Sequence, residues 1–411
     1  MKDIVKYKET NCDQYRRIFS LFILVFEGFG IRMLNGIVGS PIILWTALLV
    51  LLNFRQINKI PFSAILSFLL FCLFYLGFCS VKGIEIKPFL FAAWVSAFCV
   101  ISNYTHNLRV FMEDLYLFTK LCVYYDLLHV VAYIILKPLL FTTNFGMNPN
   151  TILYIFYFNR ENGLFDIPRI QGFCWEPSCW ICLLNLNLAL VLLLQKPRKE
   201  IILSVMAIIS VFSTTGFLTM IFVFVLYFIL YNNKTNIGAK IIIVLIFVIV
   251  FPIAKENFTE KFASGSGATR YGDFYVAEYV LRKSPLLGGD MDNITSNVGA
   301  MNAKRNNWGY YDASVLENYD GVGMTNAFAA LFVEWGLPIT LLLFYLMYMS
   351  PLFPNRKMSI LVSGTILVVL MGTPIARTGF FYMFPLSTLI IYKPWKKDFQ
   401  SSLRHIMRQI R

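Results

Sequence analysis

Four arginines from distant parts of the chain have the chemistry to hold an anionic ligand. A guanidinium presents its donors in a planar fork that matches phosphate oxygens in bidentate geometry. A diphosphate gripped in this way becomes a good leaving group, because the cations stabilise the charge that develops on it. Each arginine alone could instead pair with lipid phosphate or with an acid such as Glu27 or Asp273. The prediction that points to function is therefore that two or more of them converge on one anionic ligand. The four are Arg32, Arg169, Arg270 and Arg377.

Two carboxylates close to these arginines in sequence are candidate general bases. Glu176 lies seven residues after Arg169, directly before a proline and an apolar run. It is either an acid at a helix start, favoured by the helix dipole, or a carboxylate near the membrane surface that takes up a proton during catalysis. Both interpretations stay open. Asp273 follows Arg270 at a spacing that predicts one face of a short helix.

Aromatic and amide side chains near these charges are candidates for binding sugar. The faces of aromatic rings stack on the apolar faces of sugars, while polar groups around them form hydrogen bonds. Aromatic residues at a membrane interface also have a plain anchoring role. The candidates for binding substrate, whether diphosphate or sugar, are Arg32, Arg377, Trp175, Tyr271 and Asn326.

Two further groups of reactive residues have simpler interpretations. Asp126 and His129 are three residues apart on an expected helix, and they form either a proton relay or, as the favoured reading, a satisfied buried pair. The eight cysteines include no CxxC pair and no cluster with histidine at metal-ligand spacing, so we expect no metal and no other cofactor. Cys174 and Cys179 would pair only if they face an oxidising compartment.

The elements that position these residues are predicted to be transmembrane helices. Of the 411 residues, 57% are hydrophobic and only 14% are charged, whereas a soluble globular chain is about 45–50% apolar and about 25% charged. The apolar residues fall in runs near the length that crosses a bilayer core. We predict a single-domain, all-α polytopic membrane protein with about twelve spans, at 18–35, 38–54, 61–80, 87–103, 115–136, 177–195, 200–213, 216–231, 240–254, 325–349, 358–373 and 377–392.

The positions of lysine and arginine predict which side each connection faces. With a cytoplasmic N-terminus, the short inner loops are rich in basic residues and the short outer ones are poor in them, as the positive-inside rule requires. The net charge of +13 then reflects topology and anionic lipid rather than nucleic acid. Two long segments, 137–176 and 255–324, fall on the outer side, as do the helix ends that carry Arg32 and Arg377. The basic tail, 393–411, is cytoplasmic.

The order of these motifs resembles the bacterial O-antigen polymerases of the Wzy type, which share a superfamily with the O-antigen ligases. The resemblance spans about residues 165 to 390, and the order, spacing and sidedness of the motifs carry it, since each motif alone is weak. The motifs are Arg169-x-x-Gly172-Phe173-x-x-Glu176-Pro177, STTG at 213–216, Arg270 with Asp273 and PLLGG, and Asn326 with Glu334-x-Gly336.

This resemblance implies a metal-independent glycosyltransferase of GT-C-like architecture at the periplasmic face of the bacterial inner membrane. The family joins oligosaccharide repeat units carried on undecaprenyl diphosphate, so one lipid-linked unit is the donor and another the acceptor. By the family pattern Arg169 and Arg270 grip the diphosphate, and Arg377 adds a third contact. A polysaccharide chain-length regulator is implied as a partner by the family only.

Two alternative functions follow from the same residues. An O-antigen ligase carries a histidine just before the asparagine that corresponds to Asn326, but this chain has Thr325 there. Its three histidines are all predicted to lie away from the outer loops, which leaves Glu176 or Asp273 as the base, or donor cleavage with little help from a base. A transporter of lipid-linked oligosaccharide should carry charges at mid-membrane depth and have matching halves, and neither pattern is evident.

Overall fold

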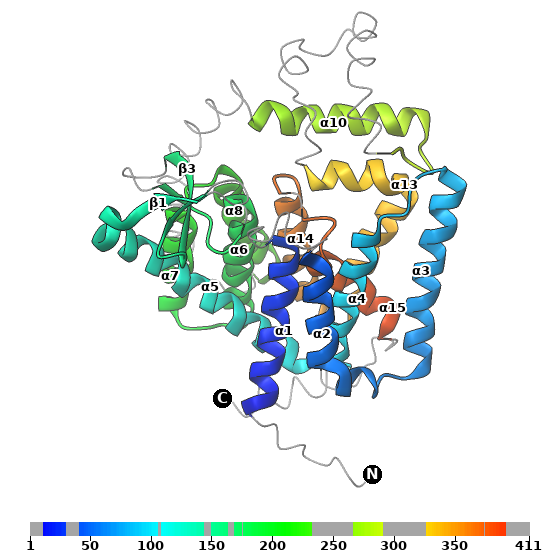
Figure 1. Cartoon of the computed structure of the whole chain (residues 1–411), viewed down its shortest axis with the longest axis horizontal. Coiled ribbons are helices and arrows are strands. Elements are labelled where there is room, and N and C mark those ends of the chain that lie inside the picture. The colour runs from blue at the N-terminus through cyan, green and yellow to red at the C-terminus, as the bar shows by residue number, and fades with distance from the viewer. Residues whose placement is uncertain are drawn as a thin grey trace, which may run out of the picture.

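The computed structural model of the chain describes residues 11–29, 41–105, 108–143, 149–162, 168–174, 176–231, 266–290, 326–373 and 375–391. Within them the chain forms a mostly helical bundle with a small sheet at one side (Figure 1). The helices are α1 (Asn11–Phe29), α2 (Pro41–Ile57), α3 (Phe62–Lys82), α4 (Pro88–Ser102), α5 (Arg109–Leu136), the short 3-10 helix η1 (Lys137–Leu139), α6 (Pro177–Leu193), α7 (Arg198–Ser210), α8 (Thr214–Tyr231), α10 (Ser266–Lys283), α13 (Ala327–Tyr348), α14 (Arg356–Leu370) and α15 (Gly379–Ile390).

Helices are present at eleven of the twelve predicted positions, and the remaining one, 240–254, lies outside the described residues. Four of the helices in the described part of the chain are long and apolar enough to cross a membrane: Phe62–Lys82, Val110–Leu139, Thr214–Tyr231 and Ala327–Tyr348. Such helices fit a mostly helical membrane protein. The prediction of twelve spans and of a GT-C-like architecture stays a prediction.

A four-stranded antiparallel sheet departs from the all-α expectation. It lies in the segment 137–176, which the sequence reading treated as a loop, and its strands pair in chain order. Three of the strands have only three residues, so no alternation of apolar and polar residues was long enough to predict them. The strands are β1 (Leu140–Thr142), β2 (Asn150–Ile152), β3 (Phe156–Asn162) and β4 (Pro168–Ile170).

The centre of the bundle is built from short helices rather than from long ones. Every residue of α6 is buried, and most of α4 and α15 is buried as well. Glycine permits the close contacts here: a Cβ at Gly379 would lie 2.7 Å from Leu24 and 2.8 Å from the carbonyl of Ala93. Likewise a Cβ at Gly216, in the STTG motif, would lie 2.3 Å from Ile181. Small residues let membrane helices approach in this way.

The long helices expose apolar side chains on the outside of the bundle. Helix α3 leaves seven large apolar residues exposed, which are Phe62, Leu66, Leu69, Leu70, Leu73, Phe74 and Val81. An apolar patch of this extent is unusual on a soluble monomer. It is the surface expected of a helix that faces lipid tails.

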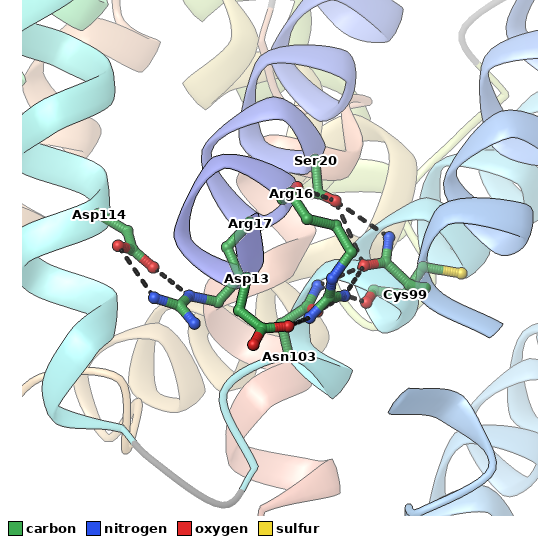
Figure 2. A network of polar contacts seen from close by, with 8 residues as sticks. Asp13, Arg16, Arg17, Ser20, Cys99, Asn103 and Asp114 are labelled. Atoms are coloured by element: carbon green, nitrogen blue, oxygen red, sulfur yellow. Dashed lines mark hydrogen bonds and ion pairs between the residues drawn. The ribbon is translucent and has the colours of Figure 1, made fainter. Parts of the chain in front are cut away.

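A buried polar network joins the beginning of α1 to three other helices (Figure 2). Arg17 Nε lies 2.5 Å from Asp114 Oδ2 on α5, and both side chains are almost completely buried. Arg16 donates to Asn53 on α2 and to Asn103 after α4, at 3.1 and 2.6 Å. Basic residues near a cytoplasmic N-terminus are what the positive-inside pattern predicts. Arg16 and Arg17 also hold the first helix in place, and α1 is helical from Asn11 on, whereas the predicted span starts at residue 18.

Candidate functional site

The first part of the site is the junction between α10 and α13. Figure 1 shows α10 lying crosswise over one end of the bundle, above the first part of α13. The helix predicted around Asp273 is therefore confirmed. Its apolar face packs on the first turns of α13 through a small separate cluster: Val276, Ala277 and Val280 from α10, with Ala329, Ala330 and Val333 from α13.

Asp273 and Asn326 organise the start of α13. The backbone N–H of Asn326 donates to Asp273 Oδ2 at 2.7 Å, and Asp273 is fully buried. Asn326 caps the helix, because its side-chain oxygen accepts from the N–H of Ala329 at 3.2 Å. Its side-chain nitrogen is buried and has no hydrogen-bond partner among the described residues. Such a donor stabilises the fold only when an acceptor reaches it.

The predicted span 325–349 is a broken helix. Gly336 has φ 71° and ψ 175°, and Pro338 follows two residues later. The break is held by backbone bonds from the segment after α10: Gly289 N–H donates to Val333 O at 2.7 Å, and Leu337 N–H donates to Pro285 O at 2.9 Å. Non-helical backbone at membrane depth is tolerated where protein satisfies its polar groups.

Two of the motifs that carry the resemblance are in direct contact at this break. Gly288 belongs to PLLGG and Gly336 to the Glu-x-Gly motif, and both have positive φ. A Cβ at Gly288 would lie 2.2 Å from the carbonyl oxygen of Val333, and one at Gly336 would lie 2.3 Å from that of Leu286. Only glycine has both the conformation and the space that the contact needs.

Glu334, just before the break, holds two cations. Arg377 Nε donates to Glu334 Oε2 at 3.1 Å, with the acid 6% and the arginine 28% exposed. The guanidinium also lies over the ring of Phe89, 5.7 Å from its centroid. Lys82 donates to the backbone carbonyl of Glu334 at 2.5 Å. The second carboxylate oxygen, Oε1, is buried without a hydrogen-bond partner among the described residues.

Lys82 and Glu334 are functional candidates that the sequence reading missed. In the sequence, Lys82 is one of the few basic residues in the short connections predicted on the outer side, and Glu334 is one position of the Glu-x-Gly motif. The proline four residues after Glu334 was the available signal, because it removes the N–H that would bond the Glu334 carbonyl in an α-helix.

The second part of the site is the segment from β4 to α6, which carries Arg169 and Glu176. Arg169 lies in β4 and is half-buried. Glu176 occupies the N-cap position of α6 with Pro177 at the first helical position, as predicted, yet its side chain makes no capping hydrogen bond. Between them, Gly172 turns the chain with φ 58° against Trp180.

The cysteines of this segment are free thiols. Cys174 and Cys179 are both buried and unbonded to each other, so a disulfide is not formed here. Burial raises the pKa of the Cys174 thiol well above its usual value. Among the described residues, no three His, Cys, Asp or Glu side chains gather at a metal-binding distance.

Asp126 and His129 do not form a relay with each other. Asp126 accepts from Trp180 Nε1 at 2.7 Å and from the Ser210 hydroxyl at 2.5 Å. His129 donates from Nδ1 to Tyr125 O at 2.8 Å, since its Nε2 accepts the N–H of Tyr157 at 3.2 Å. Each group is satisfied separately, and His129 ties the sheet to α5.

The remaining candidates are placed only in part. Arg32 and Trp175 lie outside the described residues, and Arg270 and Tyr271 lie in α10, where only their backbone is described. The two parts of the site are linked through α6: Thr373, on the segment that leads to Arg377, donates to the carbonyl of Ser178 at 3.2 Å.

Comparison with protein-family models, curated proteins and solved structures found no significant match.

Proposed function

We propose that this chain is a membrane glycosyltransferase that polymerises undecaprenyl-diphosphate-linked oligosaccharide units into O-antigen or a related surface polysaccharide. The reaction takes place at the periplasmic face of the bacterial inner membrane, with the chain termini in the cytoplasm. The resemblance in motif order suggests this activity. The observation that carries the proposal furthest is the contact between PLLGG and the Glu-x-Gly motif, beside a buried acid that holds Arg377 and Lys82.

The proposed reaction uses cations to release the lipid diphosphate. The bond between the anomeric carbon of the donor sugar and the diphosphate oxygen breaks, and the electron pair leaves with undecaprenyl diphosphate. Arg169, Arg270 and Arg377 stabilise the charge that develops on this leaving group. A hydroxyl of the acceptor unit forms the new bond to the anomeric carbon and loses its proton to a base or to water.

Glu176 suits the role of base better than Asp273. Asp273 is fully buried and accepts the backbone N–H that begins α13, so its carboxylate has a structural task. Glu176 is half-buried at the start of α6. A carboxylate with partial access to solvent can receive a proton and release it again.

The buried groups of α13 suit a sugar ligand. Among the described residues, no partner reaches the side-chain donor of Asn326 or the Oε1 acceptor of Glu334. A saccharide hydroxyl both donates and accepts, so it can satisfy either group once the segment opens to substrate.

Deleting the gene in its host and separating the surface polysaccharide on a gel tests the proposal. We expect a single repeat unit on the lipid core and no ladder, because ligation would still attach one unit. Loss of that single unit as well would identify a ligase or a transporter and would reject polymerisation.

A further inference from the structure

The turn between β2 and β3 has an unusual combination of backbone and side chains. Ile155 N–H donates to Ile152 O at 3.1 Å, which closes a four-residue turn. Its two central residues, Leu153 and Tyr154, have φ 56° and 55°. Positive φ at both centres defines a type I′ turn, for which hairpins favour Asn-Gly. Leucine and tyrosine are strained in this conformation, because their Cβ crowds the backbone.

The same turn exposes its apolar side chains. Leu153, Tyr154 and Ile155 are 53%, 58% and 52% exposed. Phe141 from β1 is also exposed, and its ring lies edge-on to Tyr154 with centroids 4.9 Å apart. Turns in water usually carry Gly, Asn, Asp or Ser. A strained turn of three exposed apolar residues is therefore poorly suited to water.

The hairpin changes from apolar to polar along its length. Away from the turn, the hydroxyl of Thr142 donates to the side-chain oxygen of Asn150 at 2.8 Å, and both are exposed to some degree. Strand β3 starts at Phe156 and ends in the sequence Asn-Arg-Glu-Asn at 159–162. Seven strand residues span roughly 23 Å, so the polar end lies well away from the turn.

The apolar turn adjoins the exposed apolar side of α5. The Tyr125 hydroxyl on α5 donates to the Ile155 carbonyl. Residues three and four apart are neighbours on a helix surface, so Tyr125 lies between Leu121 and Leu128. These two belong to an exposed stripe with helical spacing, formed by Leu121, Tyr124, Leu128, Val131 and Ile135. The helix that carries this stripe is long and apolar enough to cross a membrane.

We propose that the turn Leu153–Ile155 is embedded in the lipid bilayer, where it extends the lipid-facing surface of α5. Continuity with the α5 stripe identifies lipid, rather than another protein, as the occupant. The polar end of the hairpin then points to water.

This anchor has a consequence for the rest of the sheet. Strand β3 pairs with β4, and β4 carries Arg169. A turn fixed in the bilayer therefore fixes the height of Arg169 relative to the lipid surface. Contact of this turn with lipid does not depend on the catalytic activity proposed above.

Spin labelling of the full chain in vesicles tests the inference. Ile155→Cys and, separately, Leu153→Cys are made in a chain carrying Cys12→Ser and Cys72→Ser, which removes the two native cysteines that are not buried in the described structure. Each variant is labelled with a nitroxide and reconstituted into phosphatidylcholine–phosphatidylglycerol vesicles. Thr142→Cys, on the neighbouring strand β1 and bonded to Asn150 away from the turn, is the matched control.

We expect the ratio of collisions with oxygen to collisions with a water-soluble nickel chelate to be several-fold higher at both turn positions than at the control. Oxygen concentrates in the bilayer, whereas the chelate stays in water. A ratio equal to that of the control would show that the turn is in water and would overturn the inference. Protection from both reagents would assign the turn to a protein contact and would equally overturn it.

Discussion

Lys82 and Glu334, 252 positions apart in the sequence, meet because the ammonium of Lys82 donates to the Glu334 main-chain carbonyl. In a regular helix that carbonyl would accept the N–H of residue 338, but residue 338 is proline and has none. The carboxylate of the same residue holds Arg377. A single residue at a helix break thus fixes two cations through two different groups.

Replacing Lys82 with methionine should destabilise the protein, because the buried carbonyl of Glu334 loses the Lys82 ammonium as a hydrogen-bond donor. The cost of leaving such a group unsatisfied is about 1–3 kcal/mol. Thermal unfolding in detergent measures it, and Lys59→Met, on an exposed residue, is the control. Equal unfolding midpoints for the two variants would mean that the Lys82 bond contributes nothing.

Gly288→Ala and Gly336→Ala should each disrupt the junction between the segment after α10 and the break in α13. An added Cβ would meet a backbone oxygen at 2.2 or 2.3 Å, at positive φ, so the loss should be well over ~1 kcal/mol. Gly77→Ala in α3 is the matched control, since nothing lies within 4 Å of its Cβ position. Yield and unfolding midpoint in detergent compare the three. Wild-type behaviour of both junction variants would contradict this packing.

Asp114→Asn should be strongly destabilising, whereas Asp13→Asn should be almost silent. Removing one partner of a buried ion pair costs roughly 3–5 kcal/mol, and the Arg17–Asp114 pair is buried. The Arg16–Asp13 pair is longer, at 3.7 Å, and partly exposed, where such pairs contribute about 0–1 kcal/mol. Unfolding midpoints of the two variants, measured side by side, check this ranking. The opposite ranking would reject the buried network of Figure 2.

Arg169→Ala should abolish polymerisation while leaving the protein at its normal level in the membrane. Arg169→Lys should restore little, because an ammonium lacks the bidentate fork that binds phosphate. Arg270→Ala and Arg270→Lys should repeat the pattern. The polysaccharide ladder on a gel, with an immunoblot of the membrane fraction, reports both quantities. Ladders of wild-type length from both alanine variants would remove these arginines from the proposed site.

Glu176→Gln and Asp273→Asn separate the two candidate bases. We expect Glu176→Gln to lose the ladder without loss of protein, because glutamine cannot take up the proton. Asp273→Asn should keep much of the ladder, because its side-chain oxygen can still accept the Asn326 N–H. The reverse result would move the base to Asp273. Two active variants would indicate that leaving-group stabilisation is sufficient.

Local signals predicted the helices well. Apolar runs placed α4 and α6 to within a few residues, and the proline after Glu176 marked the start of α6, since hydropathy and proline geometry act over short stretches of chain. The spacing of Arg270 and Asp273 predicted α10 for the same reason. The strands were missed because three residues carry too little pattern, and each is stabilised by its partner strand.

The sequence by itself determined that this chain is rich in helices with apolar surfaces, and that arginines and acids stand near their ends. Tertiary structure alone decided which of those charges pair. Nothing local distinguishes Arg17, which is buried against Asp114, from a basic residue of a cytoplasmic end. Lys82 can donate to the Glu334 carbonyl only because α3 and the broken α13 pack together. Such pairs depend on which helices become neighbours, and that choice is made by packing over the whole bundle.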